Sequence, residues 1–170
     1  GIYLTLITFN SITLIMNIRK AAKKDCKKVL QILDEFRSAV SKLIDPASTK
    51  TFQDAQDCGE ELFMQTIKNP DAQIFVAEEG DNLVGILTIY KIPVLRKGEF
   101  RAEIEEMFVR NEFQGKGISQ MLMNMAKKWC KENNIKVITL ESGNELSRAH
   151  RFYKKEGFEE YAKGFKFRIN

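Results

Sequence analysis

The chain has 170 residues and a mass of 19.6 kDa, which fits a single domain able to bury a core and form a cleft. Hydrophobic residues make up 44% of the sequence and charged residues 29%, a balance that is ordinary for a globular domain and argues against a disordered chain. The net charge of +4 is unevenly divided, because residues 1–109 carry −2 and residues 110–170 carry +6. We therefore expect an anionic ligand at the C-terminal third, whereas the dispersed basic residues argue against a nucleic-acid partner.

The cysteine and histidine content predicts neither a disulfide framework nor a metal site. Cys26, Cys58 and Cys130 are widely spaced and form no CxxC pair, and His150 is the single histidine. This pattern favours a reduced, cytoplasmic setting.

The first eighteen residues carry no charge and are rich in Ile, Leu and Thr. A signal peptide would place basic residues before the apolar run, and a membrane span needs about 20 mostly apolar residues, so no membrane association is expected. The sequence from Met16 onward reads like the start of a first strand. We therefore expect residues 1–15 to be an upstream extension and residues 16–170 to form one domain. As a strand, the extension could add to a sheet edge of its own subunit or of a neighbour, which leaves a homodimer open.

The first half of the sequence predicts four strands and two helices. Asp25 is a candidate N-cap, and the apolar residues from Val29 to Leu43 follow helical spacing up to the break at Asp45-Pro46. A shorter helix is expected over residues 57–68. Strands are expected over residues 17–20, 73–79, 83–91 and 99–109, and the turn at residues 80–82 joins two of them as a hairpin.

The second half predicts two helices and two further strands. Helices are expected over residues 116–133 and 146–156, and a strand over residues 136–141 lies between them. A last strand is expected over Tyr161–Ile169, because apolar and basic residues alternate there. The order βααβββαβαβ predicts an α/β fold with a mixed, mostly antiparallel central sheet and helices on both faces.

A short glycine-containing segment, residues 109–119, joins the long strand to the next helix. Gly115 and Gly117 allow an anion to approach the main chain, and the helix N-terminus adds a partial positive charge. This arrangement suits a pyrophosphate, although the spacing matches neither a Walker loop nor GxGxxG. Taken alone, a plain strand-to-helix turn explains the segment equally well.

A second motif follows the strand at residues 136–141, and together the two motifs resemble those of the GNAT family of N-acetyltransferases. The family's pyrophosphate loop, Gln/Arg-x-x-Gly-x-Gly/Ala, is matched by Gln114 and Gly117, while Ser119 departs from the pattern but is still small. The element order is similar over residues 16–170. The family's later motif, an Asn and then Ala-x-x-Phe-Tyr-x-x-x-Gly-Phe, is matched by Asn144, Ala149, Phe152, Tyr153, Gly157 and Phe158.

The resemblance implies that acetyl-CoA is the co-substrate and that it lies between two parallel strands that separate, residues 103–109 and 136–141. It also implies that backbone groups of the first strand bind the pantetheine arm, and that the glycine loop binds the pyrophosphate. Lys116, Arg148 and Arg151 are candidates for the 3′-phosphate, although a solvated surface charge is the favoured interpretation of any single one. The implied cofactor-binding residues are Met107, Phe108, Val109, Gln114, Gly115, Lys116, Gly117, Ile118, Ser119, Asn144, Ala149 and Tyr153.

The implied activity is transfer of an acetyl group to a primary amine by direct attack in a ternary complex. Tyr153 matches the family's general acid. For the general base we favour Glu141 and Glu105 over Glu103, with an exposed or ion-paired role equally expected for each and a water chain as another solution. If no bulge interrupts the long strand, Glu106 points to the face opposite Glu105.

The acceptor is expected to be a small-molecule or peptide amine. Residues 42–68, between the first two helices, hold more acidic than basic side chains, and such a lip suits a cationic amine. The alternative function is a non-catalytic CoA-binding regulatory module on the same fold, since a fold does not determine a function. The presence of Tyr153 favours the enzyme.

Overall fold

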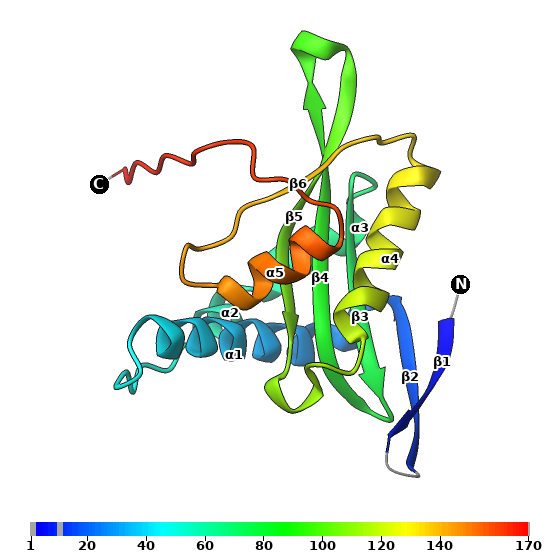
Figure 1. The fold of residues 1–170 in the computed structure, drawn as a ribbon, viewed down its shortest axis with the longest axis vertical. Helices are drawn as coiled ribbons and strands as arrows, with labels where there is room; N and C mark the ends of the chain where they lie inside the picture. The colour runs from blue at the N-terminus through cyan, green and yellow to red at the C-terminus, as the bar shows by residue number, and fades with distance from the viewer. Residues whose placement is uncertain (1–2, 10–11, 170) are drawn as a thin grey trace.

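The computed structural model describes residues 3–9 and 12–169, with side chains described from Met16 onward. Six strands in these residues form one sheet in sequential order, and every neighbouring pair is antiparallel except the last, which is parallel (Figure 1). The mixed, mostly antiparallel sheet is confirmed. The strands are β1 (Tyr3–Phe9), β2 (Ile12–Lys20), β3 (Ala72–Glu79), β4 (Asn82–Val94), β5 (Glu99–Val109) and β6 (Ile138–Leu140).

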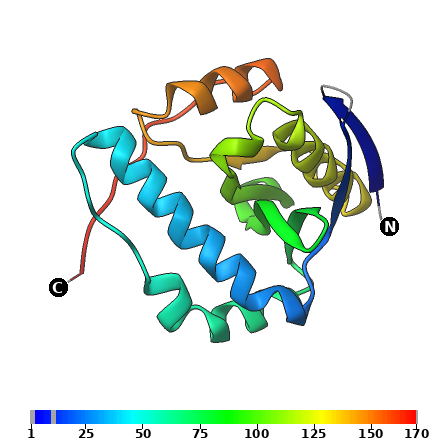
Figure 2. The same cartoon turned by 90° about the horizontal axis from the view of Figure 1, so that it is seen from below.

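Helices cover both faces of the sheet, as the sequence predicts (Figure 2). One group lies on the face that we call the α1 face, and the other lies on the α4 face. The first group is α1 (Cys26–Ile44), α2 (Asp54–Cys58) and α3 (Glu60–Lys68), and the second is α4 (Ile118–Glu132) and α5 (Ser147–Lys155). Short 3₁₀ turns are η1 (Lys23–Asp25), η2 (Leu95–Lys97) and η3 (Asn111–Phe113).

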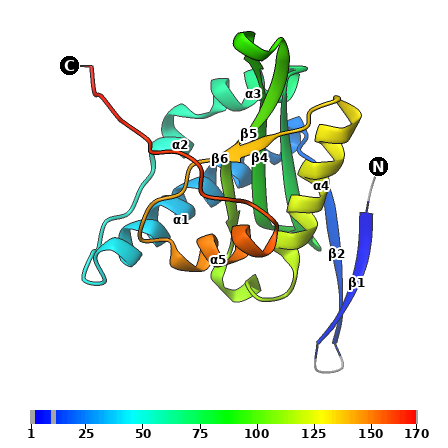
Figure 3. The same ribbon diagram turned by 45° about the horizontal axis from the view of Figure 1, so that its top comes forward.

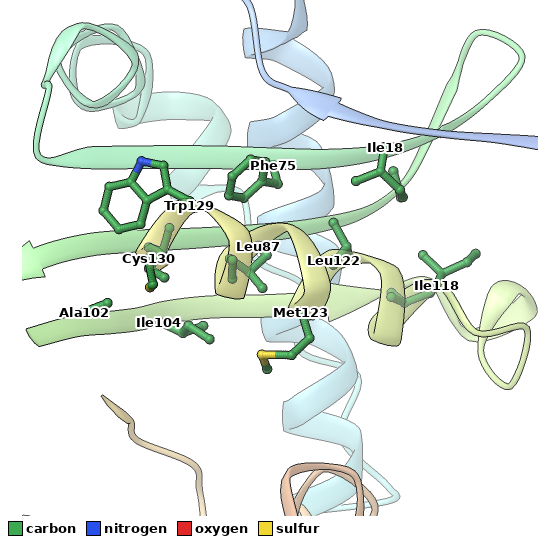
Figure 4. Close-up of a cluster of buried hydrophobic side chains, with 14 of the residues drawn as sticks. Ile18, Phe75, Leu87, Ala102, Ile104, Ile118, Leu122, Met123, Trp129 and Cys130 are labelled. Atoms are coloured by element: carbon green, nitrogen blue, oxygen red, sulfur yellow. The ribbon is translucent and has the colours of Figure 1, made fainter. Parts of the chain in front are cut away.

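Alternation along the strands divides the core between the two faces. Phe75 of β3 packs in the α4-face core, whereas its neighbours Ile74 and Val76 pack in the α1-face core. Figure 4 shows Leu122 and Trp129 of α4 lying over the sheet on the α4 face. Burying one such side chain fully contributes about 1.5–3 kcal/mol to the free energy of unfolding, so the core on each face contributes substantially to the stability of the fold.

A bulge interrupts this alternation in β5. Thr88 of β4 pairs with Glu106, but the next residue, Ile89, pairs with Ile104, so Glu105 is an extra residue. Ile104, before the bulge, and Met107, after it, both point to the α4 face. The side chain of Glu106 is therefore directed to the α1 face.

Two of the expected elements differ clearly in extent. The predicted helix over residues 57–68 is two helices that meet at Gly59, and α2 begins early because Asp34 of α1 accepts hydrogen bonds from the backbone N–H groups of Ala55 and Gln56. The first predicted strand, at residues 17–20, extends back to Ile12, and β1 pairs with it at the edge of the sheet. That residues 1–15 are a dispensable extension stays a prediction.

The prediction of a last strand over Tyr161–Ile169 is wrong, because residues 159–169 form no regular element. Phe165, Phe167 and Ile169 are 95%, 89% and 92% exposed, so the alternating apolar residues have no face to pack on. Alternation predicts a strand only where a neighbouring strand can pair with it. Because β6 is just three residues long, it offers little backbone for such pairing.

A buried ion network fixes β2 to β3 and to the start of α1. Arg19 Nη1 and Nη2 donate to Asp25 Oδ2 and Oδ1 at 2.6 and 2.9 Å, and Nε and Nη2 donate to Glu78 Oε2 and Oε1 at 2.9 Å each. The three side chains are 14%, 4% and 17% exposed. A guanidinium shared by two carboxylates in this manner satisfies charges that burial would otherwise penalise.

Candidate functional site

The parallel strands β5 and β6 pair over three residues only. Ala102, Glu103 and Ile104 align with Ile138, Thr139 and Leu140, where β6 ends, while β5 continues to Val109. In the described residues no strand pairs with this side of β5 beyond Ile104. Backbone N–H and C=O groups at such an edge can bind an extended ligand as an added strand would. The predicted residues Met107, Phe108 and Val109 occupy this edge.

The glycine loop lies at the end of the same strand and leads into α4. Gly115 and Gly117 have φ of +81° and +80°, and a Cβ at either position would meet nothing within 4 Å. The first N–H groups of α4, including those of Ile118 and Ser119, have no partner inside the helix, which makes this end suited to an anion. The geometry therefore fits the pyrophosphate site that the resemblance implies.

Side chains hold this loop in place. Gln114 Nε2 donates to the carbonyl oxygen of Val109 at 2.8 Å and to Asn111 Oδ1 at 3.0 Å, which ties the loop to the end of β5. Lys116 Nζ lies 4.7 Å from the centre of the Phe113 ring, so its charge stays beside the loop. Ile118 is 1% exposed and anchors the first turn of α4 in the core.

Helix α5 lies on the α4 face, near the loop that leads into α4 (Figure 3). Tyr153 of α5 is half-buried, and its ring contacts the rings of Phe152 and Phe158. It packs against the same core cluster as Met107 of β5. Burial raises the pKa of the Tyr153 phenol, which keeps the phenol protonated and able to donate at neutral pH.

The other predicted residues of this segment lie at the surface. Asn144 is exposed in the turn between β6 and α5, and Ala149 is half-buried on α5. Arg148 and Arg151 are exposed on the same helix and so are accessible to a phosphate.

The carboxylates favoured by the sequence are not enclosed. Glu141 directly follows β6 and is exposed, and Glu105 is exposed at the bulge. Glu103 forms an ion pair with Arg101 at 2.5 Å. None of the three combines burial with a cavity.

Glu106 does combine them. It lines a cavity of about 350 Å³ between β4, β5 and the three helices of the α1 face. Its carboxylate accepts a hydrogen bond from the Thr88 hydroxyl, and its backbone N–H donates to Thr88 Oγ1 at 3.0 Å. Burial raises the pKa of Glu106, against the lowering effect of the Thr88 hydrogen bond, and the charge of Glu105 adds to the increase.

Sequence reasoning did not select Glu106 as a candidate base, because its position depends on the bulge. Tyr90 of β4 lines the same cavity and was also missed. Burial raises the pKa of Tyr90, and the negative charges of Glu106 and Glu105 raise it further. The one signal available in the sequence was the adjacent pair Glu105-Glu106. Because neighbouring side chains of a strand point to opposite faces, one of the two carboxylates is directed to the α1 face whichever register the strand takes.

A second cavity, of about 460 Å³, lies further along β5 on the same face. Phe108 contributes to its wall and stacks on Phe36 of α1 with ring centres 5.2 Å apart. Arg110 closes one side through hydrogen bonds of 2.7 and 2.9 Å to Glu35. Both cavities therefore lie on the α1 face, opposite the face that α5 covers.

Three further features of the described part of the chain concern metal ligands, apolar helices and cysteine thiols. No cluster of three or more His, Cys, Asp or Glu side chains suited to a metal ion occurs there. No helix in residues 3–9 and 12–169 is long and apolar enough to cross a bilayer. Cys130 is buried, and burial raises the pKa of its thiol to about 11, which makes it unreactive.

Comparison with known proteins finds N-acetyltransferases among the relatives of the chain. The sequence model of the acetyltransferase (GNAT) family matches residues 36–158. An uncharacterized N-acetyltransferase of Bacillus subtilis strain 168 is 23% identical over 147 residues, which cover 85% of this chain and 91% of that protein. An uncharacterized N-acetyltransferase of Methanocaldococcus jannaschii is 35% identical over 100 residues, which cover 58% of this chain and 44% of that protein.

Two solved structures show the same fold. A transcriptional regulator from Bacillus halodurans C-125 has a TM-score of 0.76 at 24% identity, covering 91% of this chain and 99% of that one. An aminoglycoside acetyltransferase from an uncultured soil metagenomic sample has a TM-score of 0.73 at 19% identity, covering 91% and 97%. With a family match over most of the sequence, on a fold whose parallel strands separate beside a glycine loop, the chain belongs to the acetyltransferase (GNAT) family and is an N-acetyltransferase.

Proposed function

We propose that the protein transfers the acetyl group of acetyl-CoA to a primary amine by direct attack in a ternary complex. The observation that carries the proposal is the separation of β5 from β6 beyond Ile104, with the glycine loop at the end of β5. Acetyl-CoA supplies an activated acetyl thioester. The amine nitrogen forms a bond to the acetyl carbon, the carbon–sulfur bond breaks, and an amide and free CoA thiol result.

In this proposal, the residues that bind acetyl-CoA are those of the β5 edge, the glycine loop and α5. Backbone groups of Met107–Val109 hold the pantetheine arm, and the N–H groups from Gln114 to Ser119 hold the pyrophosphate. We also assign Asn144, in the turn before α5, and Ala149, on α5, to the binding of acetyl-CoA. Arg148 and Arg151 are exposed and Lys116 is partly exposed, so all three are accessible to the 3′-phosphate.

Two proton transfers accompany the reaction. An alkylammonium of pKa about 10.4 must lose a proton before attack, and the departing sulfur must be protonated or stabilised. Tyr153 donates to the sulfur through its phenol, which burial keeps protonated. We assign the base to Glu106, because burial raises its pKa and it lines a cavity. Glu141 and Glu105 are the alternatives.

The proposal is tested by measuring free thiol release from acetyl-CoA over a panel of amines. The panel contains monoamines, diamines, polyamines, peptides with free N-termini and an aminoglycoside, the class named for one structural relative. We expect at least one acceptor and a rise in melting temperature with acetyl-CoA. Binding without turnover of any amine would instead indicate a regulatory module, and no binding would reject the CoA site.

A further inference from the structure

The cavity that contains Glu106 is apolar over most of its wall. Helices α1 and α3 and strand β3 supply Val29, Leu30, Leu33, Leu62, Phe63 and Ile74. Its volume, about 350 Å³, is in the range of sites for small ligands. A ligand enclosed here must therefore offer a largely apolar surface.

The polar groups of the cavity gather at the sheet. Glu106 and Thr88 are hydrogen-bonded to each other, and Tyr90 lies close enough for the charge of Glu106 to raise the pKa of its phenol. Among the described residues, no ion pair joins Glu106 to a cation. Arg37, at the cavity rim, is already paired with Asp54 at 2.5 Å and lies over the Phe52 ring. The polar end thus presents one carboxylate that an ammonium group would complement.

This polar end is adjacent to the acetyl-CoA edge of β5. Glu106 lies two residues beyond Ile104, the last residue of β5 that pairs with β6. Its side chain enters the cavity on the α1 face, while its backbone belongs to the strand edge that faces the opening. An amine bound at Glu106 is consequently next to the strand that holds the thioester arm in the proposed function.

We infer that this cavity is the acceptor site and that the acceptor is a monoamine, with its single ammonium at Glu106 and an aliphatic or aromatic body against the apolar wall. The inference rests on the proposed function. A second ammonium would lie against leucine and phenylalanine side chains, because Asp54, the other carboxylate of the lining, is already paired with Arg37, and an unpaired charge there is unfavourable. Diamines, polyamines and aminoglycosides are therefore poor acceptors.

The experiment compares n-pentylamine with cadaverine, which differ only in the second amine group. We measure kcat/KM for each from thiol release at saturating acetyl-CoA, with 2-phenylethylamine, spermidine and kanamycin alongside. The monoamines are expected to exceed cadaverine by roughly 100-fold, the effect of about 3 kcal/mol for one buried, unpaired charge. Equal or better turnover of cadaverine, spermidine or kanamycin overturns the inference and leaves the proposed function intact. Absence of thiol release with every amine overturns both.

A pair of variants ties the selectivity to this cavity. Leu62 lines the cavity but is 65% exposed, so Leu62→Glu adds a second carboxylate without disturbing the core. Leu43 on α1 is 62% exposed and outside both cavities, and Leu43→Glu is the matched control. We expect Leu62→Glu to reduce the preference for pentylamine over cadaverine about tenfold. An unchanged preference in Leu62→Glu, or an equal reduction in Leu43→Glu, would place the acceptor elsewhere.

Discussion

Replacing Arg19 by Met should destabilise the protein more than any surface charge substitution. Arg19 makes four hydrogen bonds of 2.6–2.9 Å to Asp25 and Glu78, whose side chains are 4% and 17% exposed. Its removal leaves two carboxylates without their shared cation in a site that water reaches poorly. Breaking one buried ion pair costs about 3–5 kcal/mol, so we expect a loss of about 4 kcal/mol in the free energy of unfolding.

The loss should depend on pH in a defined direction. Burial opposes ionisation of Asp25, but hydrogen bonds from Arg19 and from the Ala22 backbone N–H outweigh it, and the pKa of Asp25 is lowered. The hydrogen bond from Arg19 likewise lowers the pKa of Glu78. A carboxyl whose folded pKa is depressed stabilises the fold above its unfolded pKa, about 4, and this stabilisation is lost as the pH falls through the folded value. The difference between wild type and Arg19→Met should therefore be full at pH 7 and shrink toward pH 3.

Urea unfolding at pH 7 and at successively lower pH measures this difference, with Trp129 fluorescence as the probe because the single tryptophan is 5% exposed. Thermal unfolding at pH 7 should show a decrease in Tm of about 10 °C for a domain of this size. Lys97→Met is the control, because Lys97 and Glu99 are exposed and 3.7 Å apart, and such pairs contribute at most about 1 kcal/mol. Equal stability of the two variants at pH 7, or a difference that grows in acid, would refute the reasoning.

Four further variants and a deletion test the site and the domain boundary. Glu106→Gln should lower kcat by about 10²- to 10⁴-fold and remove the acidic limb of the pH–rate profile. Because the folded pKa of Glu106 is raised, its ionisation costs stability as the pH rises through that value, so urea unfolding at pH 8 should find Glu106→Gln at least as stable as wild type. Tyr153→Phe should lower kcat with little change in the melting-temperature increase caused by acetyl-CoA, and unchanged turnover would remove its acid role. Gly117→Ala and Gly98→Ala should each cost about 1 kcal/mol, since both glycines have positive φ, but only Gly117→Ala should weaken acetyl-CoA binding in the thermal-shift assay. Deletion of residues 1–15 should leave soluble, active protein. If the deletion abolished all soluble, active protein, those residues would belong to the domain.

Local patterns in the sequence were sufficient for most of the fold. The apolar stripe of α4 and the continuous apolar run of β3 depend on neighbouring residues only, and both elements form close to where they were expected. The glycine loop was also readable, because positive φ at Gly115 and Gly117 is a local requirement. The predicted strand over residues 161–169 failed for the opposite reason, since a strand also needs a partner that is remote in sequence.

The carboxylates show most clearly why a site is harder to predict than a fold. With strict alternation, Glu106 would share a face with Ile104, which packs in the α4-face core. One unpaired residue at Glu105 reverses the direction of every side chain after it, so Met107 and Val109 join Ile104 in that core while Glu106 turns toward the cavity. The bulge lies immediately after Ile104, where β5 and β6 separate. A single bulge therefore directs a carboxylate to the opposite face of the sheet, at the position where β5 stops pairing with β6. The hydrophobic periodicity of the sequence does not indicate where this bulge lies.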